Sequence, residues 1–316
     1  MSKKIMTMGE ILVEIMAQDV GQSFRHPGVL LGPYASGAPA IFINQVGRLG
    51  CPAGMIGCVG DDDFGHLNIE RLRNDGVDVA GIAVLPDATT GSAFVTYRHD
   101  GNRDFVFNIT NSASARLGPQ HVSVEALQGC THFHVMGSSL FSDSIVAAMK
   151  KAVDIVKQGG GTVSFDPNVR KEMLHSPGMR AALHYFLRQA DIFLPSGEEL
   201  TLLVDAQTEP AALAELFALG VKEIVIKRGA KGASYVDQDH RVDVEPLEVT
   251  ELDPTGAGDC FGATYVACRV LGLTPAESLR LANAAGAMAV TRRGPMEGAS
   301  TFAQLREALG QAAARN

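Results

Sequence analysis

The sequence has no tryptophan, few cysteines and no long apolar segment, and each absence excludes a class of protein. Its five cysteines among 316 residues form no Cys-x-x-Cys pair, so the sequence predicts neither a zinc ribbon nor a disulfide framework. No run of about 18 apolar residues appears, and the first residues do not resemble a secretory signal peptide. We therefore expect a cytoplasmic protein with reduced thiols and no membrane partner.

Positive charge is also scarce, which argues against nucleic acid as a partner. Lys and Arg number 27 against 35 Asp and Glu, a formal net charge of −8, and no basic run is present that could follow a phosphate backbone. The chain also lacks an early Gly-x-Gly-x-x-Gly turn and a Gly-x-x-x-x-Gly-Lys-[Ser/Thr] loop, which excludes nicotinamide-linked dehydrogenases and P-loop kinases. A small anionic ligand stays possible where local dipoles and a few cations oppose the overall charge.

Strand and helix patterns alternate along most of the chain. Strands are expected at residues 5–9, 54–59, 132–136, 162–166, 191–194 and 223–227. Helices are expected at residues 38–49, 61–74, 144–158, 179–190, 210–218, 263–271 and 275–291, with one more at the C-terminus. This order predicts an α/β fold with a mostly parallel central sheet, helices on both faces, and ligands bound beyond the carboxyl ends of the strands.

A β-rich segment interrupts this alternation. Residues 92–99 and 103–109 flank Asp100-Gly101, a dipeptide suited to a tight hairpin. We expect residues 11–35 and 87–112 to form a small β-sheet lid over a core made of residues 1–10, 36–86 and 113–316. The exposed edges of such a lid also suggest a homodimer that assembles through it.

The string Asp-Pro-Thr-Gly-Ala-Gly-Asp at residues 253–259 leads directly into a helical pattern. The amides of Gly256, Ala257 and Gly258 would lie at the helix N-terminus, where N–H groups lack intrahelical acceptors and the dipole favours anions. Asp259 would be repelled by a phosphoryl group there unless it accepts a proton or holds a cation. The competing interpretation is an ordinary turn followed by a capped helix.

The same string resembles the signature of the ribokinase-like (PfkB) family of carbohydrate kinases. Before this string, other segments similar to the family's motifs occur in the family's order. They are Gly9-Glu10, Ser36-Gly37-Ala38-Pro39-Ala40, the turn at 57–63, Asp166-Pro167-Asn168-Val169-Arg170, Ser196-Gly197-Glu198-Glu199 and Lys227-Arg228-Gly229-Ala230-Lys231-Gly232. The resemblance covers essentially the whole chain. It implies transfer of the γ-phosphoryl group of ATP to a sugar hydroxyl, with Mg²⁺ as cofactor and a monovalent cation as a further candidate.

The resemblance also implies a role for individual residues. Asp259 would be the base that takes the hydroxyl proton, for which an ordinary carboxyl pKa suffices, and Gly256, Ala257 and Gly258 would form the anion hole. Glu199 would help to position hydrated Mg²⁺; it ends the family's Asn-x-x-Glu motif, whose Asn is Ser196 here. The residues implied at the nucleotide are Asn168, Ser196, Lys227, Gly229, Gly232, Thr255 and Asn283.

The sugar site departs from the family's usual pattern. The residues implied at the sugar are Glu14, Ser36, Gly37, Arg103, Arg170 and Asp259. The family loop Gly-Gly-x-x-x-Asn here has Ile41 in place of the Asn, and Asn44 is a candidate replacement one helical turn later. Asp166, Asn168 and Arg170 alternate along an expected extended segment and so should point to one side, with an Asp166–Arg170 ion pair as the structural alternative.

Two branches of the family remain as candidates for this chain. Kinases of 2-keto-3-deoxygluconate commonly place Tyr and Arg at the end of the second lid strand, whereas this chain has Phe107, Asn108 and Ile109 there. Ile109 cannot pair with a carboxylate, which favours a neutral ketohexose, tagatose or fructose. Arg103 keeps the acid sugar open, and a non-catalytic sugar-binding protein, which would not need Asp259, is the alternative from another class.

Overall fold

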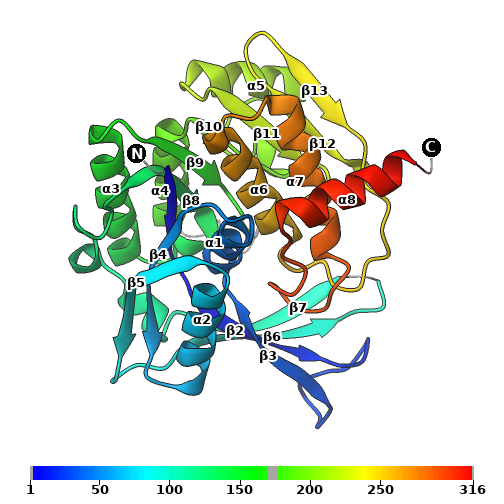
Figure 1. Ribbon diagram of the computed structural model, residues 1–316. Helices are drawn as coiled ribbons and strands as arrows, with labels where there is room; N and C mark the ends of the chain where they lie inside the picture. Colours follow the sequence, from blue (N-terminus) through cyan, green and yellow to red (C-terminus); the bar gives the residue numbers. More distant parts are fainter. Residues whose placement is uncertain (1–2, 101, 170–176, 315–316) are drawn as a thin grey trace.

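The computed structural model describes residues 3–100, 102–169 and 177–314. Its main sheet has the strand order β13-β12-β11-β10-β9-β8-β1-β4-β5 (Figure 1). Every neighbouring pair from β11 to β5 is parallel, and β12 and β13 extend the sheet in antiparallel fashion. The strands are β1 (Lys4–Met8), β4 (Ala53–Gly60), β5 (Val77–Leu85), β8 (Cys130–Met136), β9 (Thr162–Asp166), β10 (Ile192–Phe193), β11 (Glu223–Lys227), β12 (Ala233–Val236) and β13 (Arg241–Val244).

Helices cover both faces of this sheet. They are α1 (Ala38–Arg48), α2 (Asp63–Asn74), α3 (Asp143–Gln158), α4 (Pro177–Gln189), α5 (Glu209–Ala218), α6 (Ala257–Leu271), α7 (Pro275–Ala289) and α8 (Phe302–Ala313). Successive residues of a strand point to opposite faces: Val225 of β11 joins a core with α1, α6 and α7, whereas Ile224 and Ile226 join a core with α3, α4 and α5. Both faces are apolar because both are buried.

Four further strands form a separate small sheet in the order β3-β2-β6-β7. They are β2 (Leu12–Ala17), β3 (Leu30–Ser36), β6 (Gly91–Tyr97) and β7 (Arg103–Asn108). β2 and β6 are parallel, and the other two pairs are antiparallel. Arg103, Phe105 and Phe107 of β7 alternate with Asp104, Val106 and Asn108, so Arg103 shares a face with the two aromatic rings.

The predicted fold class is confirmed, and every strand and helix expected from the sequence is present within a few residues. Strands β5, β12 and β13 were not predicted. β5 and β13 are the two edge strands of the main sheet, where exposed positions interrupt the buried runs that mark the central strands, whereas β12 is buried but only four residues long, with Ser234 inside its apolar run. No helix in the described part of the chain is long and apolar enough to cross a lipid bilayer.

Candidate functional site

Several segments expected to bind ligand meet at the carboxyl ends of the parallel strands. β9 ends at Asp166, β11 ends at Lys227, and α6 begins at Ala257 behind its N-cap Gly256. Gly256 has a φ of 81°, and a Cβ there would clash with the carbonyl oxygen of Pro295, so the turn requires glycine. The first turn of α6, whose amides lack intrahelical acceptors, lies beside the end of β11, since a Cβ on Gly258 would be 3.8 Å from Lys227 Nζ.

Asp259 lies in this first turn and is almost fully buried. Its side chain is 8% exposed, and Asn168 donates its amide Nδ2 to Asp259 Oδ1 at 3.2 Å. Burial raises the pKa of Asp259 to about 8, with help from the charge of Asp166 and against the opposing charge of Lys227. The pKa is thus well above the ordinary value assumed from the sequence.

Asp166 and Lys227 form a buried ion pair beside Asp259. Lys227 Nζ is 2.5 Å from Asp166 Oδ2, and Asp166 is 1% exposed. Burial raises the pKa of Asp166 to about 6, although Lys227 acts to lower it. Asp166 was not predicted to bind a ligand, although its position at the end of a central parallel strand indicates such a role.

The segment after Asp166 is not extended as expected. Asn168 has a φ of 41°, in the left-handed region, so the alternation predicted for residues 166–170 ends at Pro167. The Asn168 side chain is directed to Asp259 by this bend, with its own N–H donating to Asp166 Oδ1 at 3.2 Å. Arg170, predicted as a sugar or phosphate contact, lies outside the described residues.

Glu199 joins two loops at the same edge of the sheet. Its Oε2 accepts the Ser196 N–H at 2.7 Å and its Oε1 accepts the Val169 N–H at 2.8 Å. Lys227 supports the Ser196 turn through its backbone: its N–H donates to Pro195 O at 2.9 Å, and its carbonyl accepts the Gly197 N–H at 3.0 Å. The fold therefore brings Glu199, the predicted metal residue, together with the predicted nucleotide residues Ser196 and Lys227.

The predicted sugar residues Glu14, Ser36 and Gly37 form a second group. Ser36 Oγ donates to Glu14 Oε1 at 2.8 Å, and Gly37 has a φ of 109° with no room for a Cβ beside the Glu10 carbonyl. The charges of Glu10 and Glu14 contribute to the raised pKa of Asp259. Asn44 does not replace the missing family Asn, because its Nδ2 donates to Asp75 Oδ2 at 2.7 Å.

Glu10 was missed as a candidate, although the sequence motif includes it. Its carboxylate is buried and accepts the hydroxyls of Ser138 at 2.8 Å and Ser139 at 2.5 Å. Burial raises the pKa of Glu10 in spite of these hydrogen bonds. Glu10 therefore ties the loop after β8 to the loop that carries Gly37.

Arg103 connects the small sheet to the loop before α6. Its Nη1 donates to Thr255 Oγ1 at 2.6 Å, and Thr255 in turn donates its hydroxyl to Asp253 Oδ1 at 2.7 Å. The guanidinium carbon also lies 5.5 Å from the centre of the Phe105 ring. Arg103 is thus directed to the anion-binding turn.

The predicted nucleotide residues Gly232 and Asn283 lie at the end of β13, and Gly229 begins the short turn that ends at Gly232. Gly232 has a φ of 82°, and a Cβ there would clash with Val244 O. Asn283 on α7 donates its Nδ2 to the carbonyl of Glu245 at 2.9 Å. Gly229 and Gly232 lie at the two ends of the turn that joins β11 to β12. This turn and α7 therefore both contact residues 244–245.

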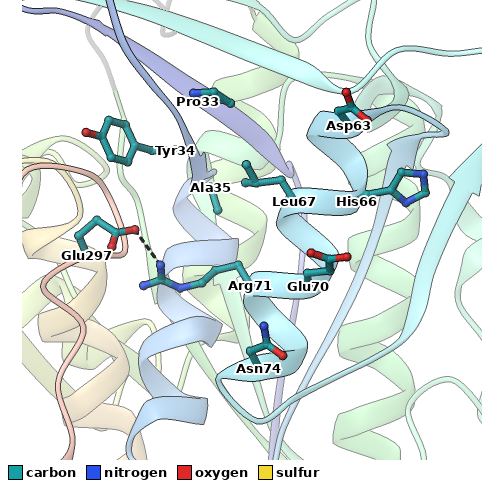
Figure 2. A pocket seen from close by; sticks show the side chains of 10 residues that line it. All are labelled: Pro33, Tyr34, Ala35, Asp63, His66, Leu67, Glu70, Arg71, Asn74 and Glu297. Atoms are coloured by element: carbon teal, nitrogen blue, oxygen red, sulfur yellow. Dashed lines mark hydrogen bonds and ion pairs between the residues drawn. The ribbon is translucent and has the colours of Figure 1, made fainter.

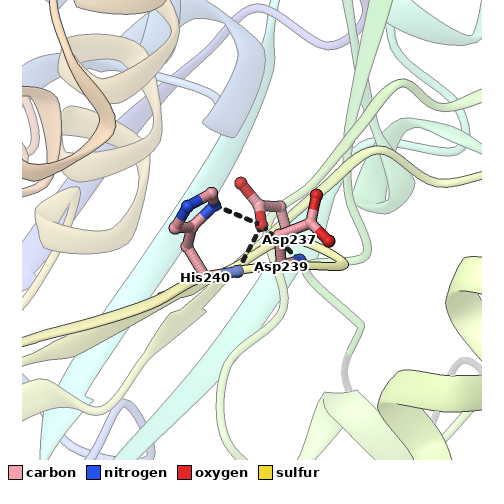
Figure 3. Close-up of side chains that lie close together, drawn as sticks. All are labelled: Asp237, Asp239 and His240. Atoms are coloured by element: carbon pink, nitrogen blue, oxygen red, sulfur yellow. Dashed lines mark hydrogen bonds and ion pairs between the residues drawn. The ribbon is translucent and has the colours of Figure 1, made fainter.

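Two other features of the described residues lie apart from this site. A cavity of about 510 Å³ between α2 and β3 is lined by Tyr34, Arg71, Glu297 and their neighbours, none of which was predicted to bind ligand (Figure 2). Asp237, Asp239 and His240 could hold a cation by their spacing, but they form the β12–β13 turn, at the opposite end of β12 from Lys227 (Figure 3). In that turn Asp237 Oδ1 already accepts the N–H groups of Asp239 and His240.

Comparisons with known proteins agree with this geometry. The "pfkB family carbohydrate kinase" model matches residues 3–301. "Probable fructokinase-3" of Arabidopsis thaliana is 34% identical over 300 residues, covering 92% of this chain and 86% of the relative.

Solved structures are similar as well. A protein from E. coli named "putative Ribokinase II" is 56% identical, with TM-scores of 0.96 in the apo form and 0.95 with ATP and Mg²⁺; 98% of this chain and 100% of that one are covered. Fructokinase from Vibrio cholerae O395, with fructose, ADP and calcium bound, is 25% identical with a TM-score of 0.83, covering 97% and 99%. The chain belongs to the pfkB family of carbohydrate kinases, enzymes that transfer a phosphoryl group to a sugar hydroxyl.

Proposed function

We propose that this carbohydrate kinase uses ATP and Mg²⁺ to phosphorylate a neutral ketohexose, fructose or tagatose. The observation that carries the proposal is the position of Asp259: a buried carboxylate in the first turn of α6, beside amides that suit a phosphoryl group. A non-catalytic sugar-binding protein would have no need for such a carboxylate, because it would repel the anion that the amides attract.

Asp259 would orient the acceptor hydroxyl and take its proton. In a loose phosphoryl-transfer transition state the attacking oxygen needs aiming more than strong deprotonation. Asn168 holds the Asp259 carboxylate by a hydrogen bond, which fixes the direction of that aim. The amides at Gly256, Ala257 and Gly258 would bind the transferred group, and Glu14, Ser36 and Gly37 would bind the sugar.

The residues present fit ATP and Mg²⁺. Both oxygens of Glu199 accept backbone N–H groups, so this carboxylate is oriented and suits a hydrated cation held through water. Mg²⁺ would supply charge neutralisation for the phosphates. Residues 229–232, Thr255 and Asn283 would line the nucleotide. A fructokinase from Vibrio cholerae O395 with fructose, ADP and potassium bound makes a monovalent cation a further candidate.

The choice of a neutral sugar rests on two residues. Ile109 stands where a kinase of acid sugars commonly has an arginine, and Arg103 is engaged by Thr255 at 2.6 Å. An acid sugar would need a cation facing its carboxylate. The relatives named fructokinase favour the same choice. 2-Keto-3-deoxygluconate remains the competing substrate, since Arg103 could exchange Thr255 for a carboxylate.

The small sheet would act as a lid and as the dimer contact of a cytoplasmic enzyme. Residues 11–35 and 87–112 carry β2, β3, β6 and β7 apart from the main sheet, and five of their large apolar side chains are exposed: Val20, Val29, Leu30, Val106 and Phe107. Closure over the sugar would exclude water from the phosphoryl group. The mass of the protein in solution tests the dimer, and a monomeric mass would refute it.

Measurement of ATP turnover across fructose, tagatose, ribose and 2-keto-3-deoxygluconate tests the proposed substrate. We expect kcat/KM to be highest for one of the two ketohexoses. An Arg103→Ala variant separates the alternatives: if it weakens turnover of the acid sugar alone, the acid sugar is the substrate class. Absence of turnover with every sugar would refute the ketohexose proposal and the proposed role of Asp259.

A further inference from the structure

The ammonium of Lys227 lies between strand β9 and the first turn of α6. It is 2.5 Å from Asp166 Oδ2, and a Cβ built on Gly258 would be 3.8 Å from Lys227 Nζ. The Lys227 side chain is 15% exposed. A cation therefore stands beside the amides that open toward the proposed phosphoryl site.

The charges of three carboxylates act on this ammonium. Burial acts to lower the pKa of Lys227, but the charges of Asp166, Glu199 and Asp259 together raise it above its usual value. Lys227 is therefore a charged residue in a place where negative charge is in excess. A buried ion pair of this kind contributes little net stability, because desolvation offsets the attraction, so stability alone does not account for it.

We propose that Lys227 is a catalytic residue whose ammonium moves from Asp166 to the transferred phosphoryl oxygens, and that Asp166 is the positioning residue that holds it beside α6 beforehand. This inference rests on the proposed kinase function. In the step itself the sugar oxygen bonds to the γ-phosphorus, the bond from that phosphorus to the β–γ bridging oxygen breaks, and the hydroxyl proton passes to the ionised form of Asp259, the form that predominates above its raised pKa of about 8.

The chemistry favours a lysine in this role. The transition state spreads negative charge over three equatorial oxygens, and a compact ammonium on a flexible stem can follow that charge. Gly258 has no side chain to separate Nζ from the α6 amides, so ammonium and amides can act on the same oxygens. The short pair with Asp166 keeps the stem folded toward this point.

The experiment compares nucleotides that differ only in the third phosphate. In a Lys227→Met variant, affinity for a non-hydrolysable ATP analogue, measured by titration calorimetry without sugar, should fall about tenfold or more, while affinity for ADP stays within about twofold. Its kcat should fall about 10²-fold. Lys222→Met is the matched control. Lys222 directly precedes the same strand at its other end, and its exposed side chain forms an ion pair with Asp191, so this variant should change neither the nucleotide affinities nor kcat.

Asp166→Asn separates positioning from binding. This variant frees Lys227, so we expect analogue affinity to be kept while kcat falls. The double variant Lys227→Met/Asp166→Asn removes both charges and guards against misfolding of the single variant. An unchanged ratio of analogue to ADP affinity in Lys227→Met or in the double variant would overturn the proposal. Failure of the wild-type protein to phosphorylate any sugar would refute the proposed function instead, because the analogue ratio is measured without turnover.

Discussion

Strand β11 has an ion-pair group at each end, and the two groups differ in their balance of charge. At its first residue, Glu223 accepts Arg269 Nη2 at 2.8 Å and the Tyr265 hydroxyl at 2.7 Å, so one anion meets one cation and a neutral donor. At its last residue, Lys227 meets the charges of Asp166, Glu199 and Asp259. The first group is complete within the protein, whereas the second has surplus carboxylates, as expected of a site that takes up a cation and a reacting hydroxyl.

The largest expected effect is at the Lys227 end of β11, where carboxylates are in excess. Asp259→Asn keeps the shape of the side chain and removes its ability to take a proton, so kcat should fall about 10³-fold while ATP binding is kept. Steady-state kinetics with the best sugar, together with calorimetric binding of ATP, measures both quantities. A kcat equal to that of the wild type would mean that Asp259 only caps the helix.

The metal requirement gives the next effect. Glu199→Gln leaves a single acceptor oxygen for two backbone N–H groups, which should loosen both loops and raise the Mg²⁺ concentration for half-maximal activity about tenfold. The same change at its exposed neighbour Glu198 is the control. If the Mg²⁺ dependence of the two variants were identical, Glu199 would belong with Glu223 as a structural residue.

At the Glu223 end of β11, where the charges are matched, we expect a substitution to change stability and not activity. Glu223→Gln leaves Arg269 without its anion in a partly buried place, so the free energy of unfolding should fall by about 2 kcal/mol. Denaturant unfolding measures this loss, and kcat should stay within about twofold of the wild type. A large loss of kcat without a loss of stability would remove the distinction between the two ends.

The same comparison explains what the sequence could predict. The central strands follow from their apolar runs, and the site at the carboxyl ends follows from the parallel order of β9, β10 and β11. The start of α6 follows from the glycines at 256 and 258, because the turn needs a positive φ and open amides. These features are local or follow from topology.

Contacts between distant segments could not be predicted in this way. Asp166 is 61 residues from Lys227, and the partner of Arg103 is 152 residues away, so no spacing in the sequence indicates either pair. The bend at Asn168 is also hidden, because a non-glycine residue with a positive φ is held there by its surroundings. The edge strands β5 and β13, and the four-residue strand β12 with its Ser234, lack the continuous apolar runs on which strand prediction depends.

The remaining expected effect is a dependence of stability on pH. The pKa of Asp259 is raised to about 8 in the folded protein, whereas an unfolded Asp ionises near pH 4. Between these values the unfolded chain has lost a proton that the folded protein keeps, so stability falls as the pH rises, by at most about 1.4 kcal/mol per pH unit.

Asp259→Asn removes this cost, and the wild type should therefore lose more thermal stability than the variant between pH 5 and pH 8. The difference in Tm should be a few degrees, and it should reach its limit near pH 8, where folded Asp259 is itself ionised. Glu223→Gln should leave the slope unchanged, since Glu223 is matched by Arg269. Parallel Tm curves for the wild type and Asp259→Asn would mean that Asp259 is ionised throughout, and that the surplus of carboxylates is already balanced before any cation binds.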